Sequence, residues 1–343
     1  MKKIFYLVFL ILGCKISIAQ QKPYYTQYIL NNYILNPAVT GIENYVDLKV
    51  SRRNQWNGLD GAPVTSYITI HGPIGKSDNR TTATSFEQTG DNPYKSKVLE
   101  SSEPATAHHG IGMTAISDKT GYINRTTVCA SYAYHMPIST STLISAGFMA
   151  GITNVSMDKS KIVWGSLNPN DPAIGINSGE IAKTMPEFGA GLWLYGKDFF
   201  LGTSVLNIVP GKFRFVTNDK YGDSFHPHFF LQGGYRFFLS DDISVLPSFA
   251  IQQISPLPTF IHANVKMQYQ DLLWIGGGYR IKDELSGIAF MTGINLGHKL
   301  NIGYSYNSSV SQRLNTYVGN THEFVIGLVL GNKGSDSCPK NVW

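Results

Sequence analysis

The feature that most constrains this chain is an alternation of apolar and polar side chains with a period of two, which recurs along most of its length. In Lys299–Asn307, large apolar and aromatic side chains occupy one face, and asparagine, glycine and serine occupy the other. Thr259–Tyr269 and His226–Phe238 repeat the pattern with histidine, amide or basic side chains on the polar face. Because successive side chains of a strand point to opposite sides, the alternation predicts an all-β chain. By itself it does not separate a barrel in lipid from a soluble sandwich.

The spacing of these segments favours the barrel. They predict about fourteen strands, near residues 45–52, 63–72, 109–117, 123–136, 141–153, 186–196, 198–207, 226–238, 242–253, 259–269, 272–280, 286–296, 299–306 and 321–330. The links are short at 137–140, 196–197, 239–241, 270–271 and 297–298, and longer at 53–62, 154–185, 208–225 and 307–320. Short periplasmic turns that alternate with longer outer loops are typical of bacterial outer-membrane barrels. We therefore predict a transmembrane outer-membrane β-barrel of about 14 antiparallel strands over residues 45–331, with a periplasmic N-terminus.

Two features disturb this pattern. The link Pro73–His108 falls where a short turn is expected, yet it is long, polar and rich in hydroxyl and acidic residues. It is either a periplasmic insertion, which we favour, or a sign that the strand count before it is wrong. Pro247 lies within a predicted strand, although proline cannot donate to the ladder and a closed barrel has no free edge. A bulge or a split strand would accommodate it.

The two ends of the chain are expected to lie outside the barrel wall. Residues 1–19 combine two lysines, an apolar run and small residues, which predicts a secretory signal cleaved after Ala19. Lipidation at Cys14 is the less favoured alternative. Residues 20–44 form an N-terminal segment that is either periplasmic or plugs the lumen, and residues 332–343 form a C-terminal tail. No later stretch offers the ~18 consecutive apolar residues of a transmembrane helix.

Composition excludes several classes of protein. Charged residues make up 15% of the chain, aromatic residues 12%, and there are 34 glycines. So few charges are unusual for a soluble domain. The formal net charge of +5 falls to +2 when the three lysines of the predicted signal are removed, which does not favour nucleic acid as a partner. Of three cysteines, Cys14 leaves with the signal, and Cys129 and Cys338 do not imply a disulfide scaffold.

Several short motifs in a fixed order carry a resemblance to a known family. They are Gln20–Gly72 with its Asn36-Pro37-Ala38, Gly110–Gly112, Asp118-Lys119, Tyr132–Tyr134, Asp171–Ala173, Pro186–Gly191, Phe200–Gly202, His228-Phe229, Gly233–Tyr235, Pro247-Ser248, Trp274–Gly276, Tyr279-Arg280, Ile302–Tyr306 and His322-Glu323. Through them the mature chain resembles the PorP/SprF proteins, outer-membrane proteins linked to type IX secretion in Bacteroidetes. The long stretch Pro73–His108 is absent from many of these proteins, and the resemblance places Pro247 within a strand.

The resemblance implies an outer-membrane barrel that works beside the type IX translocon. It implies a large secreted adhesin or gliding protein as partner, whose export and surface attachment depend on its C-terminal secretion domain. Translocon components and outer-membrane lipid are the other implied partners. No cofactor and no catalytic residue is implied.

Candidate partner-binding residues lie in the predicted outer loops. Arg52, Arg53 and Trp56 fall at the first outer turn, and arginine and tryptophan dominate interface hot spots. The alternative is that Trp56 belongs to an aromatic girdle and the arginines extend to the membrane surface. The longer loops 154–185 and 208–225 add three further anchors, Trp164, Phe213 and Arg214.

Other polar residues are expected in the lumen. The segment Tyr24–Asn36 either lines or plugs the lumen or docks on another subunit, and the sequence does not decide between these alternatives. Charged side chains on the polar faces of the predicted strands suggest a wet or filled interior: Asp47, Lys49, Arg236, His262, Lys266 and Glu323.

The sequence does not favour an enzyme. It contains no G-x-S-x-G and no H-E-x-x-H motif. His108-His109 and the pair His226 and His228 have no carboxylate or cysteine at ligand spacing, so we predict no metal site. Gly276–Gly278 lacks the helix and lysine of a phosphate loop. A channel for small or apolar solutes is the main alternative function, and an outer-membrane lipase is the weakest.

Overall fold

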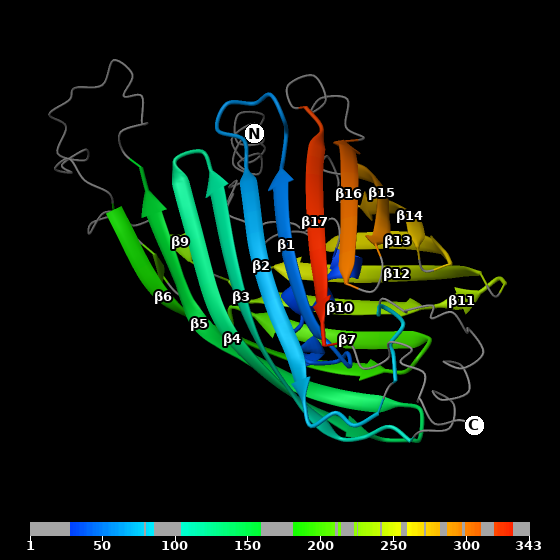
Figure 1. The fold of residues 1–343 in the computed structure, drawn as a ribbon. Helices are drawn as coiled ribbons and strands as arrows, with labels where there is room; N and C mark the ends of the chain where they lie inside the picture. The colour runs from blue at the N-terminus through cyan, green and yellow to red at the C-terminus, as the bar shows by residue number, and fades with distance from the viewer. Residues whose placement is uncertain are drawn as a thin grey trace, which may run out of the picture.

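The computed structural model describes residues 28–78, 80–85, 104–158, 181–209, 212–213, 223–224, 226–240, 242–254, 259–270, 272–281, 287–296, 299–309 and 319–331. Its dominant element is one antiparallel sheet that closes on itself (Figure 1). The wall contains β1 (Val46–Asn54), β2 (Val64–Ile74), β3 (His108–Thr120), β4 (Ile123–Pro137), β5 (Leu143–Met157), β6 (Ile181–Tyr195), β7 (Phe199–Leu206), β10 (His228–Tyr235), β11 (Phe237–Phe238), β12 (Ile243–Ile254), β13 (Phe260–Tyr269), β14 (Leu273–Ile281), β15 (Gly287–Leu296), β16 (Leu300–Ser309) and β17 (Thr321–Leu330).

Two pairings make the wall a closed cylinder. β1 pairs with β17, so the first and last strands are neighbours, and β10 pairs with both β7 and β12. The short strand β11 continues β10 against β12 in the same register, so the described wall has fourteen strands. The predicted fold class, strand number and antiparallel order are confirmed. β5 and β6 run further than predicted, to Met157 and from Ile181, because Met157 still pairs with Ile181 of β6 and with Ile123 of β4.

Pro247 sits inside β12 opposite Val265 of β13, so the strand that contains it is continuous. The interruption falls on the other neighbour. β10 ends at Tyr235 and β11 resumes at Phe237, with Gly234 opposite Ser248 and Phe237 opposite Val245. Arg236 donates its backbone N–H to the carbonyl oxygen of Asp198 at 2.6 Å, which continues the pairing with β7 through the gap. The sheet therefore accommodates Pro247 by a break between β10 and β11, the strand beside it, without a change of register.

The outer face of the wall is apolar. Across β1 to β4, one row of paired outward residues reads Val50, Ile68, Ala115 and Val128. Ile68 is 45% exposed and Val50 43% exposed. Such a band suits hydrocarbon, since every backbone group in a closed sheet is paired. Among the described residues, no helix is long and apolar enough to cross a membrane.

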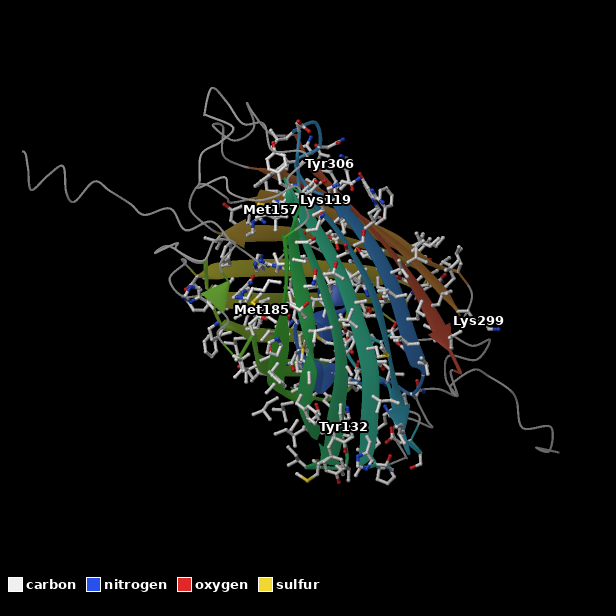
Figure 2. The ribbon with its side chains drawn as sticks, turned by 90° about the vertical axis from the view of Figure 1, so that its left-hand side faces the viewer. Lys119, Tyr132, Met157, Met185, Lys299 and Tyr306 are labelled. Carbon is white, nitrogen blue, oxygen red and sulfur yellow. The ribbon has the colours of Figure 1, made fainter. Side chains whose placement is uncertain are left out.

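The wall has two unlike ends. Short turns join β4 to β5, β6 to β7, β11 to β12 and β13 to β14 at the end where β1 begins, which we call the turn end. The longer links after β1, β5, β7 and β16 lie at the opposite, loop end. Figure 2 shows Lys119, Met157 and Tyr306 at the loop end and Lys299 toward the turn end. Within the link after β7, β8 (Lys212–Phe213) pairs with β9 (Asp223–Ser224).

The interior is filled by the chain segment that precedes β1. Residues 28–44, which we call the plug, form three 3-10 turns: η1 (Tyr28–Leu30), η2 (Asn32–Ile34) and η3 (Pro37–Val39). In Figure 1 these dark-blue turns lie inside the cylinder, behind β1 and β17. The Asn36 side chain accepts a hydrogen bond from Ala38 N, and Pro37 occupies the first turn, so the sequence itself starts η3. All residues from Tyr28 to Asn44 are buried.

Candidate functional site

The three candidate residues at the first outer turn do not share a surface. The expected position of Arg52 and Arg53 in a turn is corrected, because pairing with β2 and β17 extends β1 to Asn54. Arg52 is exposed on the outer face, whereas Arg53 is buried in the lumen. Trp56 lies in the loop beyond β1, half-buried, with a φ of 55°. Trp164 and Arg214 lie outside the described residues, and Phe213 is placed in β8 by its backbone.

The lumen, by contrast, brings together most residues that were expected to face it. Asp47, Lys49, Arg236, His262, Lys266 and Glu323 are all at least nine-tenths buried. Lys49 pairs with Asp47, and Arg53 Nε lies 4.0 Å from a carboxylate oxygen of Glu323. Paired and hydrogen-bonded charges of this kind are the form in which a closed interior tolerates ionised groups. The prediction of a polar interior of mixed charge is confirmed.

Asn36 joins the plug to the wall. Its amide nitrogen donates to the carbonyl oxygens of Leu192 in β6 at 3.1 Å and Thr203 in β7 at 3.2 Å. The Asn36 side-chain oxygen at the same time accepts a hydrogen bond from Ala38 N. One buried side chain therefore starts η3 and fixes it against two strands more than 150 residues later.

Hydroxyl groups of the wall serve the backbone of the plug. Ser145 of β5 donates to Ala38 O, and Ser204 of β7 donates to Leu35 O at 2.6 Å. On the other side of η3, Thr40 Oγ1 reaches Ser131 of β4 at 3.0 Å. These bonds satisfy carbonyls that a 3-10 turn leaves without partners, so the plug can be buried at low cost.

The wall also makes room for the plug. A Cβ on Gly147 would lie 2.6 Å from Ala38 N and Ala38 Cα. A Cβ on Gly110 would collide with the backbone of Thr40 and Gly41. Only glycine allows two backbones to approach so closely. The inward glycines of β3 and β5 are therefore matched to this plug.

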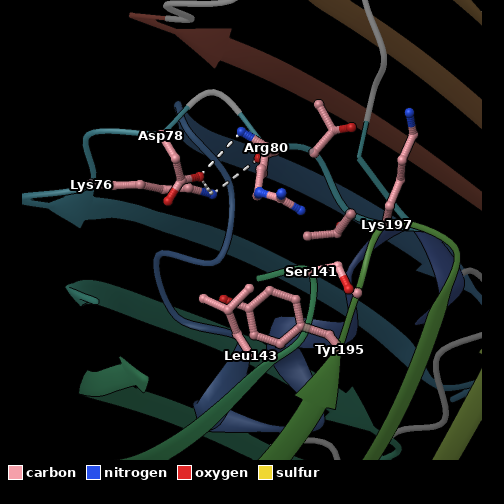
Figure 3. Close-up of a pocket in the computed structure, with 10 residues that line it drawn as sticks. Lys76, Asp78, Arg80, Ser141, Leu143, Tyr195 and Lys197 are labelled. Atoms are coloured by element: carbon pink, nitrogen blue, oxygen red, sulfur yellow. Dashed lines mark hydrogen bonds and ion pairs between the residues drawn. The ribbon is translucent and has the colours of Figure 1, made fainter. Parts of the chain in front are cut away.

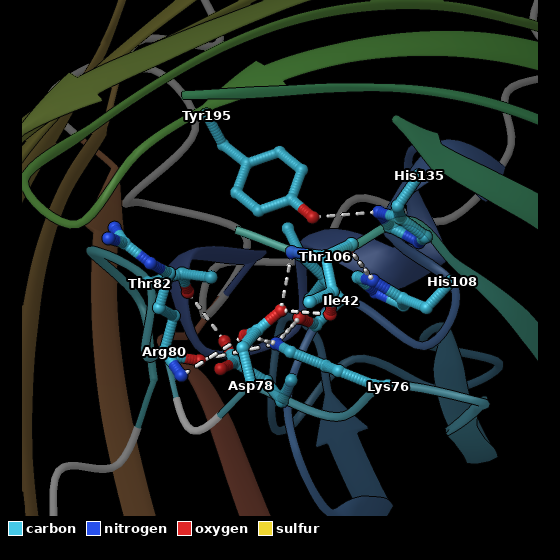
Figure 4. Close-up of polar contacts among 10 residues, drawn as sticks. Ile42, Lys76, Asp78, Arg80, Thr82, Thr106, His108, His135 and Tyr195 are labelled. Carbon is cyan, nitrogen blue, oxygen red and sulfur yellow. Dashed lines mark hydrogen bonds and ion pairs between the residues drawn. The ribbon is translucent and has the colours of Figure 1, made fainter. Parts of the chain in front are cut away.

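A second segment closes the turn end. The described residues of the β2–β3 link, 75–78, 80–85 and 104–107, form what we call the lid. Lys76 Nζ donates to Ile42 O of the plug at 2.8 Å and to Arg80 O of the lid at 3.2 Å (Figure 4). Thr82 Oγ1 donates to Glu43 Oε1 at 2.5 Å. The strand count around Pro73–His108 is thus correct, and the link is a real insertion whose residues in contact with the plug and wall, Lys76, Thr82, Ala83 and Ala105, are buried.

The lid and the plug share a buried charge cluster. Burial raises the pKa of Glu43 to about 7, although Lys76 and the Thr82 hydroxyl act in the opposite direction. Burial lowers the pKa of Lys76, opposed by Glu43 and Asp78. Burial alone would raise the pKa of Asp78, but Lys76 and hydrogen bonds from Thr106 outweigh it and leave that pKa below its usual value. Asp78 Oδ1 lies 3.9 Å from Lys76 Nζ.

Histidines support this cluster from the wall. His108 and His135 stack with ring centroids 4.3 Å apart. His135 bonds Thr40 O at 2.8 Å through Nε2. Its Nδ1 bonds the Tyr195 hydroxyl at 2.9 Å (Figure 4). His109 instead faces outward, where it contacts Tyr132 OH at 2.6 Å. Within the described part of the chain, no three histidine, cysteine, aspartate or glutamate side chains are placed to hold a metal ion.

A small pocket lies beside the lid at the turn end. Figure 3 shows Lys76, Asp78 and Arg80 on one side of it, and Ser141, Leu143, Tyr195 and Lys197 on the other. Sequence reasoning did not find Lys76, Glu43 or Thr40. Two features of the sequence could have pointed to these residues: the length and polarity of the β2–β3 link, and the Asn-Pro-Ala start of η3.

Comparison with known proteins identifies relatives by sequence. The family model described as "Type IX secretion system membrane protein PorP/SprF" matches residues 17–328. No curated protein sequence matches this chain.

Among solved structures, the outer membrane protein Omp33 of Acinetobacter baumannii is similar with a TM-score of 0.46, 7% identity, and coverage of 85% of this chain and 100% of that chain. The CymD monoaromatic hydrocarbon channel is similar with a TM-score of 0.42, 12% identity, and coverage of 91% and 94%. The beta domain of the Bordetella autotransporter BrkA gives a TM-score of 0.37 at 10% identity, with coverage of 84% and 98%. At these scores, the barrel rests on the strand pairings and not on these likenesses.

Proposed function

Because this chain belongs to the PorP/SprF family of type IX secretion system membrane proteins, we propose that it assists the export and cell-surface attachment of a large adhesin or gliding protein. The chain is an outer-membrane β-barrel of that secretion system. Its proposed partner is the C-terminal secretion domain of the cargo. In this role the barrel is an anchor and docking platform beside the translocon, and it catalyses no reaction.

The filled lumen is the observation that carries this proposal. A passive channel needs a continuous opening, whereas here the plug and the lid occupy the interior. With the described interior occupied, the outer surfaces are the ones that remain accessible to a partner. The alternative function, a channel for small or apolar solutes, is for this reason the less favoured one.

The orientation of the barrel in the membrane is part of the proposal. Outer-membrane barrels place short turns in the periplasm and longer loops outside. The turn end, with the lid, would then face the periplasm, and the plug would be joined to β1 on that side. The longer links after β1, β5, β7 and β16 would present the docking surface outside the cell.

Candidate contacts follow from this orientation. Trp56 is half-buried at the loop end, and the exposed side chain of Leu59 follows it in the same loop. Trp164, Phe213 and Arg214 in the longer links remain predicted anchors. Aromatic and arginine side chains are expected to supply most of the affinity.

The test is to delete the gene and quantify the cognate adhesin at the cell surface by antibody labelling of intact cells. We expect display to fall strongly and to return when the wild-type gene is restored. Affinity purification from native outer membrane should also retain a very long chain with a C-terminal secretion domain. Unchanged display in the deletion strain, with normal levels of the adhesin, would contradict the proposal.

A further inference from the structure

We propose that the lid locks the plug inside the barrel, so that the turn end is sealed against ions and solutes, and that Lys76 is the residue that couples lid to plug. This inference concerns the interior alone and does not depend on which protein docks outside. It assigns a role to the described part of the long β2–β3 link.

The lid crosses the opening of the barrel. It begins at the end of β2, and Arg236 beside β10 donates through Nη2 to the carbonyl oxygen of Ala83 in the lid. In the order of strands around the wall, β10 and β2 are separated by six steps. In a wall of fourteen strands, six steps reach nearly the opposite side. Between these points, Ala105 N donates to Thr140 O in the β4–β5 turn at 3.2 Å.

Lys76 is the contact that joins the two layers. Its ammonium donates to Ile42 O, which belongs to the plug, and to Arg80 O, which belongs to the lid. Its side chain is 4% exposed and lies beside the carboxylates of Asp78 and Glu43. A buried ammonium with several acceptors holds its partners in place, because each acceptor would otherwise be buried without a donor.

Thr82 provides the second bond between the layers. The Thr82 hydroxyl donates to Glu43 at the end of the plug. Thr82 is 4% exposed. Ala83, the next residue, is 1% exposed, and its carbonyl oxygen accepts the hydrogen bond from Arg236. The plug therefore cannot move toward the turn end unless the lid moves first.

The experiment measures conductance of the purified full-length protein in planar lipid bilayers. Wild-type protein should remain closed, and Lys76→Met should increase the open time about ten- to a hundredfold, as expected for the loss of hydrogen bonds from a charged donor. Lys299→Met is the matched control, because Lys299 is exposed at the same end of the barrel and should leave the protein closed. Correct folding of each variant is checked by heat-modifiable migration on gels.

A covalent clamp distinguishes movement of the plug from general damage. Thr40 Oγ1 and Ser131 Oγ are 3.0 Å apart, so Thr40→Cys with Ser131→Cys can link plug to wall. Cys129→Ala and Cys338→Ala are added to prevent mispairing. Oxidation should close the Lys76→Met channel, and reduction should reopen it.

Three outcomes would overturn the proposal: folded Lys76→Met that stays as closed as wild type, openings that the clamp does not suppress, or equal openings in Lys299→Met. If Lys76→Met does not fold, Thr82→Val is measured in the same way. A closed Thr82→Val variant would then refute the coupling of lid to plug.

Discussion

Two regions of the lumen wall cover their inward glycines in different ways. Around η3, at Gly110 of β3 and Gly147 of β5, the space is taken by plug backbone, although side chains of the wall cover Gly189 and Gly202 in the same half. In the half formed by β12 to β16, such space is taken by side chains of the wall itself. There Asn264 covers Gly278, and the Trp274 ring covers Gly293.

This difference shows how one repeating pattern encloses two kinds of interior. Alternation with a period of two decides only which side chains point inward. The size of those inward side chains decides whether a strand leaves space for the plug or fills the lumen with its own side chains. The wall hydrogen bonds to η3 therefore come from β4 to β7. The other side supplies Lys266, Gln268 and His262 as filling, and its Leu246, Trp274 and Met291 belong to the same apolar cluster as the plug.

The largest expected effect comes from the same substitution made in both halves. Gly147→Ala places a methyl group against plug backbone, which cannot move aside, and should cost about 2 to 3 kcal/mol of unfolding free energy. Gly278→Ala meets the end of the Asn264 side chain, which can rotate, and should cost less than about 1 kcal/mol. Urea unfolding in detergent, followed by tryptophan fluorescence, measures both. Equal losses would show that the halves do not differ.

A pH response should come from the plug side of the lumen. Burial raises the pKa of Glu43 from 4.5, its ordinary value, to about 7 in the folded protein, so the folded state holds the extra proton between these values. Stability from this group is therefore fully present below pH 4.5 and is lost as pH rises to about 7, by on the order of 1 to 3 kcal/mol.

Glu43→Gln isolates that response, because glutamine keeps an acceptor for Thr82 and cannot ionise. Lys76, Asp47 and Lys49 also act on Glu43 and remain in the variant. The difference in midpoint between wild type and variant, measured from pH 4 to 8, should grow with pH and level off above about 7. A difference that is constant across this range would contradict the assignment.

The smallest effect compares two buried serines. Ser204 donates to Leu35 O of the plug, and Ser204→Ala should cost about 1 kcal/mol. Ser305 in β16 is fully buried, and in the described part of the chain its hydroxyl has no hydrogen-bond partner. Ser305→Ala should therefore be neutral or slightly stabilising in the same unfolding measurement. A greater loss at Ser305 than at Ser204 would reverse the comparison.

The wall was predictable from sequence and its contents were not. Alternation identified all fourteen strands and the inward charges such as Lys49 and Glu323, because each strand carries its own pattern. The plug and the lid have no period, and their positions depend on bonds such as Asn36 to Thr203 that join distant parts of the chain. Of the plug, only the start of η3 at Asn36-Pro37 is a local signal. Arg53 was misplaced because the end of β1 depends on its neighbours.

The pairing of β1 with β17 also constrains biogenesis. Residues 28–44 are synthesised before any strand, and the cylinder cannot close until Thr321–Leu330, the last strand, has been delivered. A segment tethered directly to β1 and bonded to β4 through β7 can therefore acquire its full set of wall contacts only when those strands are in place. Residues 28–44 would then act as a core around which the strands of the barrel assemble.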